Sequence, residues 1–260
     1  MIISAYCVIL ALMFTVTVVF LGSLAATLLS VMSGGGAAII TLPIFLWAGI
    51  SLPVSVAATK ICALFWTPLS AYNYLKRRRI DWLFLLLFSA LGLAGAYAGV
   101  QFVVDVNEDL LKPVIGGLII ALVVFSFFNK QLGSARHQST SGLKRFLAYP
   151  AALAMGFYES ILGSGNGIIF AALTCHTRGF DFITALGYYF GIAFFWVGFA
   201  ALLYVQKGYY DIPIMAAASL GSIIGGYAGS RYARYRGNRF TKRVFITVGL
   251  ILGIKMILGI

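Results

Sequence analysis

The motif Ser33-Gly34-Gly35-Gly36 runs into the short apolar stretch 37–48, and Ser164-Gly165-Asn166-Gly167 opens a second short apolar stretch over 166–175. Successive small residues hold a helix weakly, so we expect the chain to unwind at each motif and restart as a helix after it. In an apolar chain such breaks leave helix ends within the bilayer, where exposed backbone groups can bind an ion. The two motifs therefore predict a transporter.

The chain around the motifs repeats as well. The sequence of Gly95–Gly99 matches that of Gly225–Gly229, and Asp81 matches Asp211, both at an offset of 130 residues. Because this spacing stays nearly constant from the first motif to the Gly-xxx-Gly, it predicts two halves with the same arrangement of elements. Glycines four residues apart, as in each Gly-xxx-Gly, are typical of close helix packing in lipid.

Composition indicates an integral membrane protein. Of the 260 residues, 61% are hydrophobic and only 10% are charged, and no charged residue or histidine precedes Lys60. A spanning helix needs only ~20 apolar residues. The first apolar segment, 2–29, has no basic start and is longer than the apolar part of a signal peptide, so we expect a permanent span. A multi-pass protein of the cell (inner) membrane follows.

Other function classes find little support in the sequence. The net charge of +12 comes from basic residues at the ends of apolar runs, so membrane topology explains it better than nucleic acid does. Cys7, Cys62 and Cys175 form no metal-binding or disulfide pattern and are expected to be packing residues. His137 and His176 alone offer almost no ligands for zinc or haem, so neither a metal nor a cofactor is expected.

Ten apolar segments can be drawn along the chain. Two are the short stretches after the motifs, and eight are longer: 2–29, 54–74, 82–103, 110–128, 146–162, 182–205, 212–230 and 244–259. If the short stretches fold back without crossing, nine Lys and Arg residues lie inside and eight lie outside. If both cross, fifteen lie inside and only Lys112 and Lys207 outside. Cytoplasmic loops carry an excess of Lys and Arg, so the second arrangement is favoured.

The expected fold is therefore all-α and polytopic, with two inverted repeats of about five membrane segments each. The first repeat covers 1–128, a cytoplasmic linker 129–143, and the second repeat 144–260. Inverted repeats place the substrate site near mid-membrane at the pseudo-twofold axis. The oligomeric state is left open.

The restarted helices are the expected anion site. Each presents free N–H groups and the positive end of its dipole, to which Ser33 and Ser164 add hydroxyls and Asn166 an amide. A simple kink or a tight helix contact is the alternative. The predicted substrate-binding residues are Ser33, Gly34, Gly35, Gly36, Thr59, Lys60, Ser164, Gly165, Asn166 and Gly167.

Two charged residues lie within apolar segments. Lys60 is either a counter-charge for the anion or a side chain that snorkels to the outer interface. Glu159, close before the second motif, could carry a coupled proton, pair with Lys60 or lie at the outer interface. Asp81 and Asp211 each open a helix and are expected to cap it. Pro43 and Leu52-Pro53 are expected to end and restart helices after the first motif.

These elements together resemble a known family. The order Ser-Gly-Gly-Gly, Pro43, Gly49-Ile50-Ser51-Leu52-Pro53, Ala57-Ala58-Thr59-Lys60, Asn73-Tyr74-Leu75-Lys76, Ile80-Asp81-Trp82 and Gly95-Ala96-Tyr97-Ala98-Gly99 resembles the TauE/SafE sulfite-exporter family, also called the TSUP permeases. The resemblance covers about residues 20–258 and implies movement of sulfur-containing anions such as sulfite, thiosulfate or sulfoacetate. The second copy departs from it, because Asn166 replaces a glycine and Gly187-Tyr188 stand where Thr59-Lys60 stand.

We therefore expect a secondary transporter, in the direction of export, for a small and sulfur-containing anion. Its partners are that anion and the lipid bilayer. An anion channel with the same helix-end site is the first alternative. A membrane enzyme is the second, and it lacks paired catalytic carboxylates, a histidine-based constellation and metal-ligand spacing in the sequence.

Overall fold

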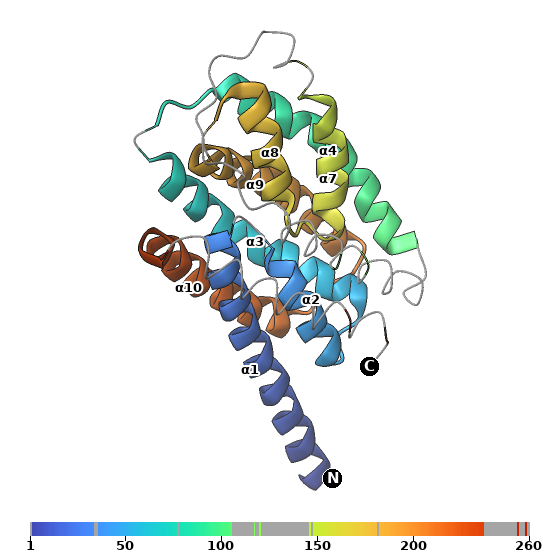
Figure 1. The fold of residues 1–260 in the computed structure, drawn as a ribbon. Coiled ribbons are helices and arrows are strands. Elements are labelled where there is room, and N and C mark those ends of the chain that lie inside the picture. The colour runs from blue at the N-terminus through green and yellow to red at the C-terminus, as the bar shows by residue number, and fades with distance from the viewer. Residues whose placement is uncertain are drawn as a thin grey trace.

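The computed structural model shows an all-helical protein (Figure 1). It describes residues 2–33, 36–76, 78–105, 148–180 and 182–236, with the single positions 117, 120, 146, 254 and 258. The expected segments 110–128 and 244–259, the linker 129–143 and Lys112 lie outside these ranges, apart from those single positions.

Eight helices make up the described ranges: α1 (Ile2–Ser33), α2 (Ala37–Trp47), α3 (Leu52–Leu75), α4 (Trp82–Asp105), α7 (Pro150–Ile161), α8 (Asn166–Arg178), α9 (Phe182–Gln206) and α10 (Ile212–Arg236). Within this part of the chain, five helices are long and apolar enough to cross a membrane, namely α1, α3, α4, α9 and α10. The expected multi-pass, all-α architecture is confirmed to this extent.

The three remaining helices are short. α2 has 11 residues, α7 has 12 and α8 has 13. At ~1.5 Å of rise per residue each is about 16–20 Å long, well under the ~30 Å of a hydrocarbon core. The prediction of a full-length segment over 146–162 is therefore wrong, because the chain leaves helical geometry at Leu162 and turns at Gly163 and Gly165, whose φ values are +72° and +77°.

Both helix restarts occur where the sequence predicts them. α1 ends at Ser33 and α2 begins at Ala37, while α8 begins at Asn166. Leu52-Pro53 begins α3, as expected. The prediction that Pro43 ends a helix is wrong, since Pro43 lies inside α2 as its seventh residue. A proline this close to the N-terminus of a helix removes one backbone hydrogen bond, and the helix continues past it.

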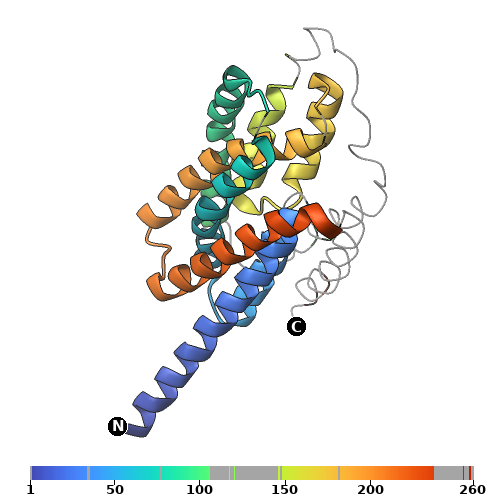
Figure 2. The same ribbon diagram turned by 90° about the vertical axis from the view of Figure 1, so that its left-hand side faces the viewer.

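Helices from the first half of the chain pack against helices from the second half (Figures 1 and 2). α1 packs along α10 and α7 packs along α4, with α3 against α9 as a further extensive contact. Glycines make the first two contacts possible. A Cβ atom at Gly95 would lie 1.9 Å from the carbonyl oxygen of Leu153, and one at Gly225 would lie 2.3 Å from that of Leu24. The expected role of both Gly-xxx-Gly motifs in close packing is confirmed.

The loop before α4 meets the end of α8 and the start of α9 at one end of the bundle. Arg178, the last residue of α8, forms an ion pair of 2.9 Å with Asp81, and Arg78 donates a hydrogen bond to Thr184. Asp81 also caps α4 by accepting from the N–H of Phe84 at 3.0 Å. Asp211 caps α10 in the same way, by accepting from the N–H of residue 214 at 3.1 Å, so both capping predictions are confirmed.

Candidate functional site

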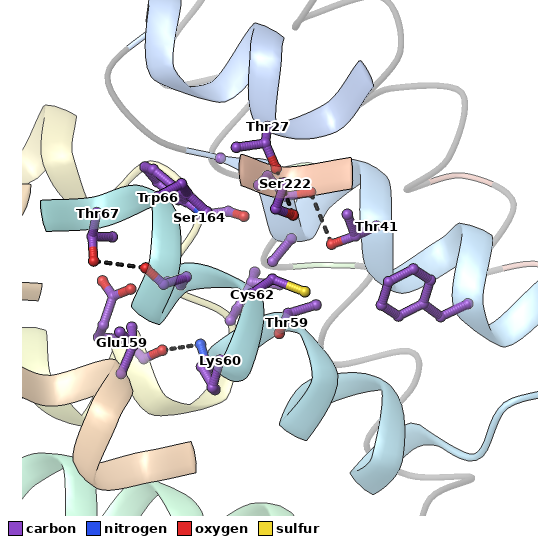
Figure 3. A pocket seen from close by; sticks show the side chains of 18 of the residues that line it. Thr27, Thr41, Thr59, Lys60, Cys62, Trp66, Thr67, Glu159, Ser164 and Ser222 are labelled. Carbon is purple, nitrogen blue, oxygen red and sulfur yellow. Dashed lines mark hydrogen bonds between the residues drawn. The ribbon is translucent and has the colours of Figure 1, made fainter. Parts of the chain in front are cut away.

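A small cavity lies in the middle of the helix bundle, where the two helix breaks meet (Figure 3). Its volume is about 40 Å³. A single buried water needs about 10–15 Å³ on this measure, so the space suits a few waters or one small ion. It is lined by residues of α1, α2, α3, α7, α9 and α10 and of the turns before α2 and α8: Thr27, Gly36, Ala37, Ala38, Thr41, Phe45, Thr59, Lys60, Cys62, Ala63, Trp66, Thr67, Glu159, Leu162, Gly163, Ser164, Tyr189, Val197 and Ser222.

The second glycine motif caps the helix that follows the first. The N–H of Ile39, in the first turn of α2, donates to the Ser164 hydroxyl oxygen at 3.0 Å across 125 residues of sequence. Ser164 is 1% exposed. A helix begins with N–H groups that have no partner inside the helix, and a serine oxygen is a preferred partner for one of them. Ala37 and Ala38, the first two residues of α2, line the cavity beside this contact.

Glycine is required at both breaks by backbone conformation. Gly36 precedes α2 with φ +139°, and Gly165 precedes α8 in the left-handed region with φ +77°. L-residues with a side chain rarely adopt such φ values. The sharp turns bring α2 and α8 to the centre of the bundle with their N-terminal ends inside it.

Lys60 faces the cavity from the middle of α3. Its side chain is 3% exposed, and its ammonium group donates a hydrogen bond to the backbone carbonyl of Glu159. This carbonyl belongs to the last turn of α7, where helix carbonyls lack partners and the helix dipole is negative. Of the two interpretations of Lys60, snorkelling to the outer interface is therefore wrong.

The Glu159 carboxylate joins three helices. It is on α7, its side chain is only 6% exposed, and its Oε2 accepts from Asn166 Nδ2 on α8 and from the Tyr189 hydroxyl on α9, both at 2.7 Å. The expectation that it could lie at the outer interface is wrong. Within the described part of the chain, its carboxylate forms no ion pair with Lys60 within 4 Å, so the contact between the two residues runs through the backbone carbonyl.

Hydroxyl groups line much of the remaining wall. Thr41, Thr59 and Thr67 donate to backbone carbonyls of their own helices, at 3.1, 2.7 and 2.7 Å respectively. Thr27 on α1 donates to the Ser222 hydroxyl on α10 at 3.0 Å. The free thiol of Cys62 lies beside them and is buried, as expected of a packing residue, although it also lines the cavity.

The structure brings together only part of the predicted site. Gly36, Thr59, Lys60, Glu159 and Ser164 line the cavity. Asn166, Gly165 and Gly167 are buried behind them at the start of α8, where Asn166 supports the Glu159 carboxylate. Gly34, Gly35 and the Ser33 side chain lie outside the described residues.

Several cavity residues were not predicted from the sequence: Thr27, Thr41, Thr67, Tyr189 and Ser222. A usable signal was present, because hydroxyl side chains in otherwise apolar spans tend to face other helices or a polar cavity rather than lipid. That signal does not distinguish a residue of the cavity wall from one that only joins two helices.

Comparison with known proteins places the chain among membrane transporters. A family model described as sulfite exporter TauE/SafE matches residues 18–256. The chain is 26% identical over 235 residues to a protein of Sinorhizobium sp. named "Probable membrane transporter protein ORF9", with 86% of this chain and 85% of that protein covered. It is 23% identical over 243 residues to "Probable membrane transporter protein YfcA" of Escherichia coli (strain K12), with 92% and 87% covered.

A third relative gives the same result. A "Probable membrane transporter protein" of Haemophilus influenzae is 23% identical over 244 residues, with 92% of this chain and 93% of that protein covered. No solved structure matches the chain. These comparisons confirm a membrane transporter rather than an enzyme, and they confirm the resemblance seen in the sequence. Since the family model covers nearly the whole chain, the chain belongs to the sulfite exporter TauE/SafE family.

Proposed function

We propose that this chain is a secondary transporter that exports a small sulfur-containing anion, such as sulfite, thiosulfate or an organosulfonate, by alternating access. One observation carries the proposal. The ammonium group of Lys60, 3% exposed, lies on a small central cavity beside the N-terminal residues Ala37 and Ala38 of α2. A buried cation and a helix N-terminus on one cavity are the groups that hold an anion away from water.

The substrate-binding residues in this proposal are Gly36, Thr59, Lys60 and Ser164 on the cavity wall, with Ser33, Gly34 and Gly35 before α2 and Gly165, Asn166 and Gly167 shaping the second break. The Ser164 oxygen accepts from Ile39, so its own hydroxyl proton is available to donate. The Glu159 carboxylate holds α7, α8 and α9 around the cavity, which suits a gating or coupling role. The small volume of the cavity suits a small ion.

An inverted repeat supports alternating access, and the helix contacts are consistent with one. Gly95 on α4 lies over the Leu153 carbonyl of α7, and Gly225 on α10 lies over the Leu24 carbonyl of α1. The two pairs correspond to each other, because Gly225 lies 130 residues after Gly95 and Leu153 lies 129 residues after Leu24. The end of α3 meets the end of α10 through Asn73 and Ser230, at 2.9 Å.

The same end of the bundle holds the starts of α4 and α9, which Asp81 and Tyr188 connect. The end of α3 thus lies beside the start of its counterpart α9, as expected if one half is inverted relative to the other. In this arrangement 1–128 and 144–260 are the two repeats, and 129–143 is the cytoplasmic linker. Two inverted halves that rock about a central site are a common plan for alternating access.

Export needs no separate energy source in this proposal. A monovalent anion that leaves a cell gains ~2.3 kcal/mol per 100 mV of inside-negative membrane potential. An anion channel would use the same gradient and is the alternative function. The relatives described above are named probable membrane transporters, which favours a transporter.

Counterflow in proteoliposomes tests the proposal. Vesicles loaded with unlabelled sulfite should accumulate external radiolabelled sulfite transiently, because a transporter exchanges one anion for another at a single site. A channel carries no such exchange, so sulfite conductance without counterflow would assign the chain to the alternative. Sulfate and phosphate serve as control anions, and empty liposomes measure the leak.

A further inference from the structure

Three threonine hydroxyls on the wall of the central cavity can accept a hydrogen bond from an occupant but cannot donate one. A backbone carbonyl can only accept, so each threonine that contacts one must donate its hydroxyl proton to it. Thr59 and Thr67 on α3 do so at 2.7 Å, to the carbonyls of Val56 and Ala63. Thr41 on α2 does so at 3.1 Å. All three residues line the cavity and their protons are already engaged, so their hydroxyl oxygens can offer an occupant only lone pairs.

Donors to an occupant come from other groups. They include the Lys60 ammonium, the first N–H groups of α2 and the protons of the Ser164 and Ser222 hydroxyls, whose oxygens accept from Ile39 and Thr27. An anion that is only an acceptor, such as sulfate, is satisfied by these donors but places its remaining oxygens against threonine lone pairs. Two acceptors that face each other in a water-poor space leave both without a partner, which is costly.

In the described part of the chain, the cavity wall offers a bound anion a single cation. In the described part of the chain the wall carries one cation, Lys60, and one carboxylate, Glu159, which accepts from both Tyr189 and Asn166. A bound monoanion adds one negative charge to this wall and a dianion adds two. Uncompensated charge is expensive away from water, so the second charge disfavours the dianion.

We infer that the cavity selects a monoanion that carries its own hydrogen-bond donor, as hydrogen sulfite does and the sulfite dianion, sulfate and thiosulfate do not. The charged oxygens lie toward Lys60 and the N-terminus of α2, and the acidic O–H donates to a threonine oxygen. This inference rests on the proposed function, since it concerns the anion bound at the same site. It makes Thr41, Thr59 and Thr67 specificity-determining residues.

Binding to the purified protein tests the inference through pH. Sulfite changes from monoanion to dianion close to neutral pH, whereas methanesulfonate stays a monoanion and has no acidic proton. The apparent affinity for total sulfite should fall by about tenfold for each pH unit above the pKa of hydrogen sulfite, following its protonated fraction. Methanesulfonate, measured by calorimetry over the same pH range, corrects for titration of the protein.

Variants of the threonines test the acceptor role. Thr41→Val, Thr59→Val and Thr67→Val keep the shape of the side chain and remove its oxygen. A single O–H donates to one oxygen and a hydrogen bond contributes about 1 kcal/mol, so at least one of Thr41→Val, Thr59→Val and Thr67→Val should weaken hydrogen sulfite binding by about fivefold and leave methanesulfonate binding unchanged. Thr174→Val is the matched control, because Thr174 is fully buried and donates to the Phe170 carbonyl at 2.7 Å on α8, outside the cavity wall.

The outcomes separate the inference from the proposed function. Sulfate or methanesulfonate binding as tightly as hydrogen sulfite would overturn the inference and leave an anion transporter. The inference would also be overturned if none of Thr41→Val, Thr59→Val and Thr67→Val lost more hydrogen sulfite binding than Thr174→Val does. If none of these anions binds to the folded protein at any pH, the proposed function itself fails.

Discussion

At the residue scale, Lys60 and Glu159 are the charged groups whose positions depend most on the fold. Each lies within apolar sequence, and each is buried on one small cavity. Charged side chains inside a membrane protein generally face its interior or a water-filled space, and they often act on an ion or substrate. Their contact through a backbone carbonyl leaves both charged groups near the space that an anion would occupy.

Replacement of Lys60 should weaken anion binding strongly. A charge-assisted hydrogen bond contributes ~1.5–3 kcal/mol, and ~1.4 kcal/mol is a factor of ten, so Lys60→Met should lose at least tenfold in affinity for sulfite. Lys60→Arg should retain part of the binding because it keeps the charge. Thermal-shift titration measures this, since a ligand that binds the folded state raises its Tm.

The control for Lys60 is Lys207→Met. Lys207 is exposed after α9 and does not line the cavity, so its replacement should leave sulfite affinity unchanged. A loss smaller than threefold in Lys60→Met would remove this residue from the binding site.

For Glu159 we predict an effect on the rate of exchange. Glu159→Gln keeps the size of the side chain and weakens its contacts with Asn166 and Tyr189, which join α7, α8 and α9. Sulfite affinity should stay within about threefold of wild type, while counterflow slows by roughly tenfold, as expected for a step of conformational change. A pH-sensitive dye inside the vesicles separates the two roles, because proton movement in wild type that is lost in Glu159→Gln would indicate coupling. Unchanged counterflow in Glu159→Gln would exclude both roles.

At the scale of elements, close backbone contacts decide how the two halves fit. Gly95 and Gly99 of α4 lie against the backbone of α7, while Gly225 and Gly229 of α10 lie against that of α1. In lipid, such contacts replace the hydrophobic effect as the force that holds helices together. The short helices α2 and α8 make smaller contacts with other helices, and their position depends on these larger helix pairs.

A methyl group at Gly95 should separate α4 from α7. The added Cβ would lie 1.9 Å from the Leu153 carbonyl oxygen, and a backbone atom cannot move aside as a flexible side chain can. Overpacking of this kind costs about 1–3 kcal/mol or more, so Gly95→Ala should lower the Tm of the detergent-solubilised protein and reduce its yield. In Gly191→Ala, the control, the nearest atom would be a Leu85 methyl at 3.3 Å, and little change is expected. Equal Tm values for the two variants would contradict the close α4–α7 contact.

At the scale of the whole molecule, the distribution of Lys and Arg predicts the orientation in the membrane. Among the described residues, the end of the bundle that holds Lys76, Arg78, Arg178 and Arg231 carries more basic residues than the end that holds Lys207. Cytoplasmic loops carry such an excess, so the first end is expected to face the cytoplasm. At that end the Asn73–Ser230 contact joins α3 to α10, and the Arg178–Asp81 ion pair joins the end of α8 to the loop before α4.

Accessibility of single cysteines tests this orientation. In a background without Cys7, Cys62 and Cys175, a cysteine introduced as Arg234→Cys should react with a membrane-impermeant reagent only from the cytoplasmic side. Lys207→Cys is the matched variant at the opposite end and should react only from outside. Labelling of both variants from the same side would contradict the inverted arrangement.

The sequence alone determined the class of the protein, the helix restarts and the family. Composition and the length of the apolar runs are enough to indicate membrane spans, because lipid excludes unpaired backbone groups wherever they occur in the chain. Glycines before Ala37 and Asn166 marked the two breaks, since backbone conformation is a local property. The aspartate caps at Asp81 and Asp211 were predictable for the same reason.

Only the tertiary structure decided which groups meet. Local sequence could not show that the helix within 146–162 has only 12 residues, because an apolar run of this kind reads alike whether it spans the bilayer or forms a short buried helix. Nor could it show that Ser164 caps α2, across 125 residues, or that Lys60 is buried against α7 rather than extended to the interface. These contacts depend on how the halves pack, and the free energy of a buried charge depends on everything around it.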